Sequence, residues 1–264
     1  MSARDIKEFD GLFSRLEDLK KRAVRGEMGI SAFFSPRELH YAEAYLRSSG
    51  MGEAYFCYGG YSIAERKKIY ILPEYMEGVT DASLLAEYGE ESGILAVRIK
   101  GSGFASLSHR DFMGALLSLG IERSVIGDIL VLDQSSALVF CESKIAGFIV
   151  SELNTVGRDK VRCSLTELED DFCPKRSYAQ ISDTIASARL DCIVAALCNL
   201  SREKARECVV DGRVELDYEY CERPDKEVSP PCVMSVRGYG KFRICSVGEQ
   251  TKKGRYRLYA EKFL

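Results

Sequence analysis

Residues 187–191 read Ser-Ala-Arg-Leu-Asp, residues 200–206 read Leu-Ser-Arg-Glu-Lys-Ala-Arg, and residues 211–216 read Asp-Gly-Arg-Val-Glu-Leu. Apolar residues recur at helical spacing from 190 to 197, which predicts a first short helix with one buried face. Ser201 stands where a helix N-cap belongs, and Gly212 stands where helices commonly end. The stretch therefore predicts two short helices followed by a strand.

The same stretch carries an arginine or a lysine at each joint between its elements. Ala205, Cys208 and Val209 supply the buried side of the second helix, which leaves the cations for another surface. A compact helical pair that presents several cations is suited to binding a phosphate backbone. The alternative is an amphipathic helical hairpin whose arginines are merely solvated. The predicted RNA-binding residues of this stretch are Arg189, Ser201, Arg202, Lys204, Arg206 and Arg213.

This ordered pattern closely resembles the S-four RNA-binding domain. The family pattern is an Arg-Leu-Asp start, a Ser-Arg opening of the second helix, an Ala-Arg pair and a Gly-x-Val turn into a strand, and all four are present. The resemblance implies a small α-L fold that docks on structured RNA such as rRNA or tRNA. A carboxylate facing RNA would be repelled, so Asp191 is expected to position Arg189 or another cation through a charge-assisted hydrogen bond.

Charge is unevenly distributed along the chain. The 264 residues have a net charge of -3, which argues against indiscriminate coating of nucleic acid. Residues 232–264 nevertheless hold eight Lys/Arg, Lys252 and Lys253 among them, against two acids. This excess predicts a local electrostatic footprint. Within it, Arg237, Tyr239 and Lys241 lie on a glycine-opened turn, where the cations would contact RNA and Tyr239 would stack on a base. The alternative places Tyr239 in the core at a strand bend.

The ten cysteines do not have the spacing of a disulfide or zinc framework. The charged N-terminus lacks the apolar region of a secretory signal, and no apolar stretch is long enough to span a membrane. The thiols are therefore expected to be reduced, in the cytoplasm. No two cysteines are separated by only two residues, and His40 and His109 are the only histidines. The sequence predicts no metal site and no cofactor.

The fold class expected is α+β, in three domains. Residues 1–75 predict an N-terminal α/β unit of two helices and two strands, with Ile6 on the apolar face of the first helix. Residues 76–166 predict the order β-α-β-β-α-β, which is a ferredoxin-like or RRM-like domain. Residues 167–182, where Asp170, Asp171, Lys175 and Arg176 lie, predict a linker. Residues 183–264 predict the S-four domain.

Three further segments sharpen the family resemblance. They are Gly-Gly-Tyr at 59–61 with Ala-Glu-Arg-Lys at 64–67, His-Arg-Asp-Phe at 109–112, and Ser-Val-Arg-Gly-Tyr-Gly-Lys-Phe at 235–242. In this order they resemble the YlmH-like family of bacterial proteins over nearly the whole chain. The family usually has a Gly-Asp turn before the last segment, whereas this chain has Pro-Pro-Cys-Val at 230–233. The contacts of that turn are therefore not carried over.

The resemblance implies a non-enzymatic cytoplasmic factor that binds rRNA and tRNA on the large ribosomal subunit carrying an obstructed peptidyl-tRNA, in ribosome quality control. No membrane or DNA partner is expected. The alternatives are an RNA-modifying enzyme that uses the S-four domain for targeting, and an adaptor linked to cell division. No catalytic residues are predicted, because no set of nucleophile, base and orienting group is apparent.

Two motifs have both a structural and an RNA-binding interpretation. Ser108 and Asp111 have capping-box spacing, so His109 and Arg110 start a helix and are additional candidate RNA contacts. Arg66 and Lys67, near Gly59 and Gly60, are further candidates, because backbone amides and cations there could hold phosphate. A tight hairpin with a solvated end is the alternative.

Overall fold

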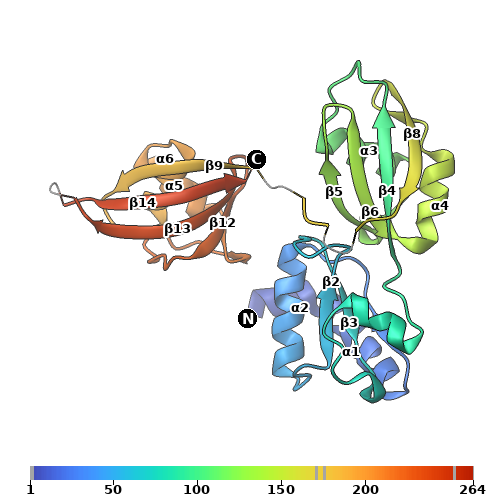
Figure 1. The fold of residues 1–264 in the computed structure, drawn as a ribbon. Helices are drawn as coiled ribbons and strands as arrows, with labels where there is room; N and C mark the ends of the chain where they lie inside the picture. Colours follow the sequence, from blue (N-terminus) through green and yellow to red (C-terminus); the bar gives the residue numbers. More distant parts are fainter. Residues whose placement is uncertain (1–2, 170–171, 175–176, 252–253, 264) are drawn as a thin grey trace. The chain divides into compact units, whose positions relative to one another are not determined.

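The computed structural model describes residues 3–169, 172–174, 177–251 and 254–263, and forms two compact units, Met1–Pro174 and Lys175–Leu264 (Figure 1). The side chains of residues 3, 4 and 6 are not described. Predictions that concern the side chain of Ile6, and Asp170, Asp171, Lys175, Arg176, Lys252 and Lys253, therefore lie outside the described residues.

The first unit begins with a small helix-and-sheet layer. Its helices are α1 (Ala3–Val24) and α2 (Pro36–Ser48), and its sheet has the order β1-β3-β2, from β1 (Gly29–Ile30), β2 (Tyr55–Tyr58) and β3 (Lys68–Ile71). The α2 start is a capping box, because the Ser35 amide donates to the Glu38 carboxylate at 2.7 Å and the Glu38 amide donates to Ser35 Oγ at 3.3 Å. The predicted two helices and two strands are confirmed, and β1 is an additional short strand.

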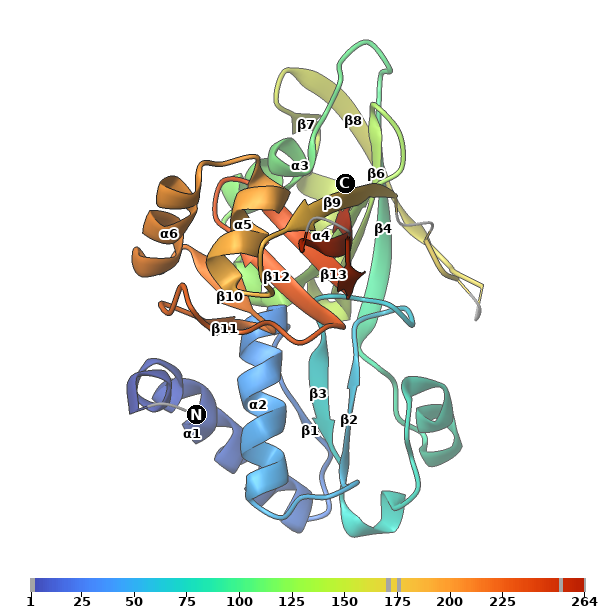
Figure 2. The same ribbon diagram turned by 90° about the vertical axis from the view of Figure 1, so that its left-hand side faces the viewer.

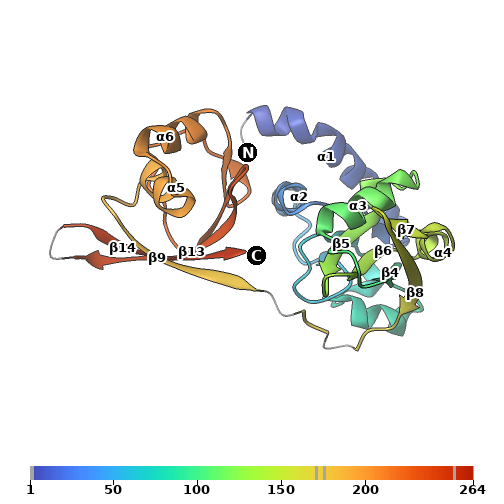
Figure 3. The same cartoon turned by 90° about the horizontal axis from the view of Figure 1, so that it is seen from above.

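A five-stranded antiparallel sheet completes the first unit. It follows the short 3₁₀ turns η1 (Glu74–Met76) and η2 (Ala82–Tyr88). Its elements are β4 (Ile94–Gly101), α3 (His109–Ser118), η3 (Arg123–Val125), β5 (Ile126–Val131), β6 (Ser136–Glu142), α4 (Ser143–Glu152), β7 (Thr155–Val156) and β8 (Asp159–Thr166). The strand order is β5-β6-β4-β8-β7, and α3 and α4 pack on one face (Figure 3). The predicted succession of strands and helices is present, with β7 added.

Asp128 on β5 joins the sheet to the β2–β3 connection. Its carboxylate accepts hydrogen bonds from the Tyr61 hydroxyl at 2.6 Å and from the amides of Glu65 and Arg66 at 2.7 and 3.0 Å. Close packing adds to the joint, because a Cβ on Gly60 would lie 2.3 Å from the ring of Phe140. Gly60 also has a φ of +101°, so only glycine fits here without strain.

The second unit is an antiparallel sheet with two helices on one face. The sheet has the order β11-β10-β12-β13-β14-β9, and α5 and α6 lie next to one another (Figure 2). The elements are β9 (Tyr178–Ile185), α5 (Leu190–Cys198), α6 (Arg202–Val210), β10 (Val214–Leu216), β11 (Glu219–Tyr220), β12 (Cys232–Val236), β13 (Gly240–Gln250) and β14 (Tyr256–Phe263). The two predicted short helices and the strand after them are confirmed.

The predicted linker 167–182 extends too far toward the C-terminus, because strand β9 begins within it. This strand begins at Tyr178 and pairs with β14 along its length, with Phe263 opposite Tyr178 and Tyr256 opposite Ile185. It lies at the edge of the sheet, where polar and charged side chains are common because they keep the unpaired backbone groups from pairing with another chain. Its polar composition therefore resembles that of a linker.

We expect Asp128→Ala to lower the free energy of unfolding by on the order of 3 kcal/mol, because three donors lose a charged acceptor. Urea denaturation at neutral pH measures the change. Asp133→Ala is the matched control, since its carboxylate is exposed and accepts from Ser135 and Ser136 of its own hairpin turn. Equal losses in the two variants would show that Asp128 does not fasten the β2–β3 connection to the sheet.

Candidate nucleic-acid interface

Helix α6 separates its apolar and cationic residues onto different sides. Ser201 Oγ accepts a hydrogen bond from the Lys204 amide at 3.3 Å, which makes Ser201 the predicted N-cap. Ala205, Cys208 and Val209 are buried in the core of the unit. The side chains of Arg202, Lys204 and Arg206 are exposed to solvent. The helix therefore presents three of the predicted cations on an accessible surface.

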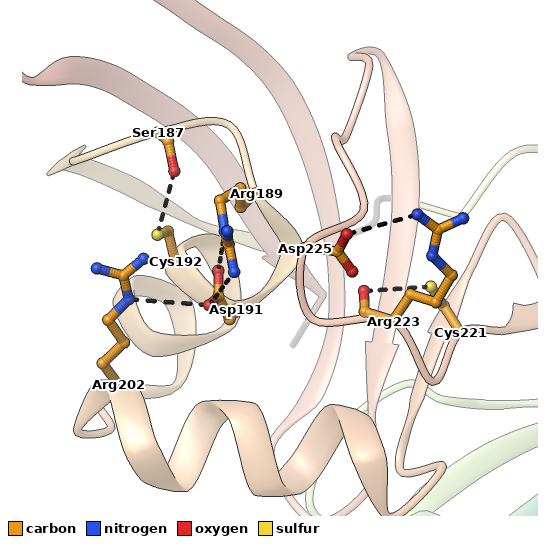
Figure 4. Close-up of polar contacts among 8 residues, drawn as sticks. All are labelled: Ser187, Arg189, Asp191, Cys192, Arg202, Cys221, Arg223 and Asp225. Carbon is orange, nitrogen blue, oxygen red and sulfur yellow. Dashed lines mark hydrogen bonds and ion pairs between the residues drawn. The ribbon is translucent and has the colours of Figure 1, made fainter.

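A buried carboxylate organises the cations at the start of α5 (Figure 4). Asp191 is only 2% exposed, and it accepts two hydrogen bonds from Arg189, from Nε at 3.1 Å and from Nη2 at 3.0 Å. Arg202 approaches the same carboxylate with its Nε at 3.8 Å from Oδ2. The predicted positioning role of Asp191 is confirmed, and the carboxylate links the N-termini of α5 and α6.

Electrostatics at this carboxylate keep it ionised. Burial alone would raise the pKa of Asp191, but the hydrogen bonds from Arg189 and Cys192 and the positive charges of Arg189 and Arg202 outweigh burial and hold the pKa below its ordinary value. Reciprocally, the hydrogen bond to Asp191 raises the pKa of Arg189. A negative charge under two guanidinium groups cancels part of their charge, but it fixes their positions.

The loop between β11 and β12 completes the N-terminus of α5. The amides of Leu190 and Asp191 donate to the carbonyls of Lys226 and Pro224, at 2.9 and 3.0 Å. On this loop, Arg223 Nη2 lies 3.5 Å from Asp225 Oδ2, which makes an ion pair (Figure 4). The role of this loop has no signature in the sequence, because its carbonyls act through the backbone. It satisfies two amides that a helix N-terminus leaves without a partner.

The predicted turn at 237–241 joins β12 to β13. Arg237 is exposed, and its carbonyl accepts a hydrogen bond from Arg213 Nη2 at 3.0 Å. Arg213 therefore supports the turn. Tyr239 is half-buried against the core, which is the alternative that the sequence left open. Lys241 Nζ lies 5.0 Å from the centroid of the Phe263 ring. RNA contact by these residues stays a prediction.

The candidates in the first unit have roles within the fold. Arg66 donates from Nε to the carbonyl of Ile126 at 2.9 Å, and from Nη2 to the carbonyls of Phe33 and Arg123, both at 3.1 Å. This guanidinium therefore fastens the two layers of the unit. Lys67 is half-buried, and its backbone pairs with that of Phe34.

The start of α3 supports the capping interpretation of the His-Arg-Asp motif. Asp111 accepts a hydrogen bond from the Ser108 amide at 2.8 Å and from the Ser108 hydroxyl at 2.6 Å. Partial burial, and then the charge of Arg123, lower the pKa of His109. Both His109 and Arg110 are exposed, and their contact with RNA stays a prediction.

The described residues contain neither a cluster that could hold a metal ion nor a helix that could span a membrane. Among them, no three His, Cys, Asp or Glu side chains are arranged to hold a metal ion. Burial raises the pKa of Cys141 to about 12 and those of Cys163 and Cys198 to about 11. These thiols are protonated at neutral pH and are therefore poor nucleophiles. In the described part of the chain, no helix is both long and apolar enough to cross a bilayer.

We expect Asp191→Asn to lower the free energy of unfolding by about 1–3 kcal/mol at pH 7, because Arg189 and Arg202 lose a buried charged partner. A lowered pKa stabilises the fold above the ordinary Asp value of 3.8, and this contribution is lost as the pH falls through the folded pKa. The difference between wild type and variant should therefore narrow below about pH 4. Urea unfolding across this range measures it.

The matched control for Asp191→Asn is Asp225→Asn, which removes one partner of an exposed aspartate–arginine pair in the same unit. Exposed pairs contribute about 0–1 kcal/mol, so the control should change stability little at any pH. A gap between Asp191→Asn and wild type that stays constant down to pH 3 would contradict the ionised role of Asp191.

Three comparisons with known proteins bear on the identity of the chain. Residues 91–170 match the family model described as "Putative RNA-binding domain in YlmH". The ribosome-associated protein quality control protein P2 of Bacillus subtilis (strain 168) is 29% identical over 244 residues, covering 92% of this chain and 91% of that protein. A solved structure described as the cell division protein ylmH from Streptococcus pneumoniae aligns with a TM-score of 0.49 and 17% identity, covering 63% of this chain and 93% of that one.

The match at residues 91–170 contains the central sheet with α3 and α4. The similarity to the Bacillus subtilis protein extends over both compact units, including the α5–α6 stretch. These two findings agree with the motifs at 59–67, 109–112 and 235–242, and the chain is similar to YlmH-like proteins over most of its length.

Proposed function

We propose that this protein is a non-enzymatic RNA-binding factor of the cytoplasm that binds the large ribosomal subunit carrying peptidyl-tRNA, in ribosome quality control. The second unit serves as the S-four domain that grips structured rRNA or tRNA, and the five-stranded sheet serves as a ferredoxin-like domain. The observation that carries the proposal is the cationic surface of α5 and α6, in which Arg189 and Arg202 are held over Asp191.

The charge arrangement favours contact with phosphate. Lys204 and Arg206 are exposed and, within the described residues, have no ion pair or hydrogen bond from their side chains. Arg202 is 61% exposed while its Nε faces Asp191. Free and pre-positioned cations side by side combine electrostatic attraction with a fixed geometry, and structured RNA offers phosphates in fixed positions.

The comparisons support the choice of partner. The Bacillus subtilis protein that is similar over 92% of this chain is named for ribosome-associated quality control. The family model matched by residues 91–170 is described by RNA binding. Transferring these properties to this chain gives the ribosome and its RNA as the partners to test.

Binding to large ribosomal subunits should weaken steeply as salt rises, because contacts to phosphate release counterions. We expect the apparent affinity for the subunits to fall at least about tenfold between roughly 50 and 200 mM monovalent salt. Sedimentation of the purified protein with subunits at several salt concentrations measures this. Affinity that is unchanged across the range would contradict a phosphate-based interface.

The double variant Arg202→Glu and Arg206→Glu should abolish co-sedimentation while the protein remains folded, as judged by a cooperative thermal melt. The two side chains are one helical turn apart and exposed. Arg202→Glu also removes one of the two positive charges beside the buried Asp191 and adds a negative charge there, so we expect some loss of stability. The neutral variant Arg202→Gln and Arg206→Gln removes the attraction to phosphate without placing a second negative charge next to Asp191.

The matched control for this experiment is Arg15→Glu with Lys144→Glu, which changes the net charge equally. Arg15 on α1 and Lys144 on α4 are exposed and, in the described part of the chain, form no ion pair. Co-sedimentation should persist in the control. Full binding by the Arg202 and Arg206 double variants would exclude α6 from the interface. If the charge-reversed and the neutral variant both unfold, the two arginines are needed for the fold.

A further inference from the structure

The open face of the five-stranded sheet carries a second set of cations. Alternate residues of a strand share a face, and residues opposite one another in a ladder share it too. Arg98 and Lys100 on β4 therefore share a face with Arg162 on β8, because Lys100 lies opposite Arg162 and Arg98 lies opposite Ser164. Lys160 is two residues from Arg162 on the same face. We call Arg98, Lys100, Lys160 and Arg162 the sheet cations.

The other face of this sheet is the core of the unit. Val97 and Ile99 alternate with the sheet cations of β4 and pack with Phe112 of α3 and Ile149 of α4. Part of the open face is covered by aromatic rings. The Phe140 ring centroid lies 4.8 Å from that of Tyr61 and 6.4 Å from that of Phe172, and the latter two are 5.9 Å apart. The part around the sheet cations is not covered, and all four are exposed.

The charges of the sheet cations are not neutralised by the part of the chain that the structure describes. Within the described residues, none of the four makes an ion pair or a side-chain hydrogen bond. The nearby acids are engaged, because Asp159 accepts from the Ser102 amide at 3.0 Å and Asp133 accepts from the Ser135 amide at 2.8 Å. Like charges directly opposite each other, as at Lys100 and Arg162, destabilise a sheet. A bound anion would remove this repulsion.

An exposed aromatic ring lies just beyond the end of β4. Phe104 is 98% exposed, in a loop anchored at both ends. Ser102 is held by Asp159 at one end, and the Leu107 amide donates to the carbonyl of Gln134 at 2.7 Å at the other. Single exposed apolar residues are common on proteins. Phe104 follows Lys100 by only four residues, however, and an anchored ring at this end of β4 offers a stacking surface for an unpaired base.

We infer that the sheet cations and Phe104 form a second RNA-binding surface, which holds the phosphates of a single-stranded RNA segment and stacks one base on Phe104. The inference relies on the proposed function only for the choice of RNA as partner. Single-stranded RNA is favoured over a duplex because stacking on Phe104 requires an unpaired base. A single stacked base gives little sequence information, so we expect this binding to be tolerant of sequence.

The test uses the full chain in the Arg202→Glu and Arg206→Glu background, so that two of the three cations of α6 no longer contribute. The probe is a labelled 20-nucleotide oligouridine, and fluorescence anisotropy gives Kd at several salt concentrations. Lys100→Glu with Arg162→Glu should weaken binding at least about tenfold and should reduce the slope of log K against log salt by about 1.4 for two lost phosphate contacts. Arg15→Glu with Lys144→Glu is the equal-charge control and should bind like its background.

Phe104→Ala should weaken binding about fivefold or more, whereas Phe104→Tyr should retain it, because only the ring is needed for stacking. Thermal melts verify folding, and Lys100→Gln with Arg162→Gln replaces the charge reversal if that variant is unfolded. The inference would be overturned if the variants at Lys100, Arg162 and Phe104 left both the affinity for oligouridine and its salt dependence unchanged. Sedimentation with large subunits tests the α6 surface separately, so failure of the proposed function remains distinguishable.

Discussion

A carboxylate that is almost fully buried must be neutralised by its surroundings, and at Asp191 this requirement shapes the whole start of α5. Removing an ionised group from water is costly unless charged and hydrogen-bonding partners replace the water. Arg189 supplies a two-point contact and Arg202 supplies a second positive charge from α6. One buried group thereby sets the relation between the two helices and the placement of two cations that face solvent.

The first unit uses the same principle for a different purpose. Asp128 gathers one hydroxyl and two amides from the β2–β3 connection, and Arg66 binds three carbonyls on its neighbours. Lys68, which is 5% exposed, lies 3.0 Å from Glu142. Because each of these groups is satisfied by fixed backbone or side-chain partners, the small sheet and the large sheet are fastened together. In the first unit, these charged groups therefore stabilise the packing of the two sheets.

Hydrophobic spacing and caps made most elements predictable from the sequence. The apolar spacing from 190 to 197, with Ser201 and Gly212, located α5, α6 and β10 because these signals are local. The role of Asp191 was also predictable, since a carboxylate among arginines has few other uses. Strand β9 was not, because its pairing with β14 joins residues far apart in sequence. The sheet cations were missed for a related reason, since Lys100 and Arg162 become neighbours only through the β4–β8 ladder.

Sequence also does not separate a cation that binds the protein from one that is free to bind a partner. Arg66 and Arg206 both belong to motifs rich in basic residues, yet Arg66 binds three carbonyls, while the Arg206 side chain has no partner within the described residues. The difference depends on which backbone groups the fold leaves unsatisfied nearby. A net charge of -3 gives no general attraction to nucleic acid. Attraction must therefore come from local groups of cations that the fold does not itself neutralise, and the accessible surfaces of α6 and of the β4–β8 ladder meet that condition.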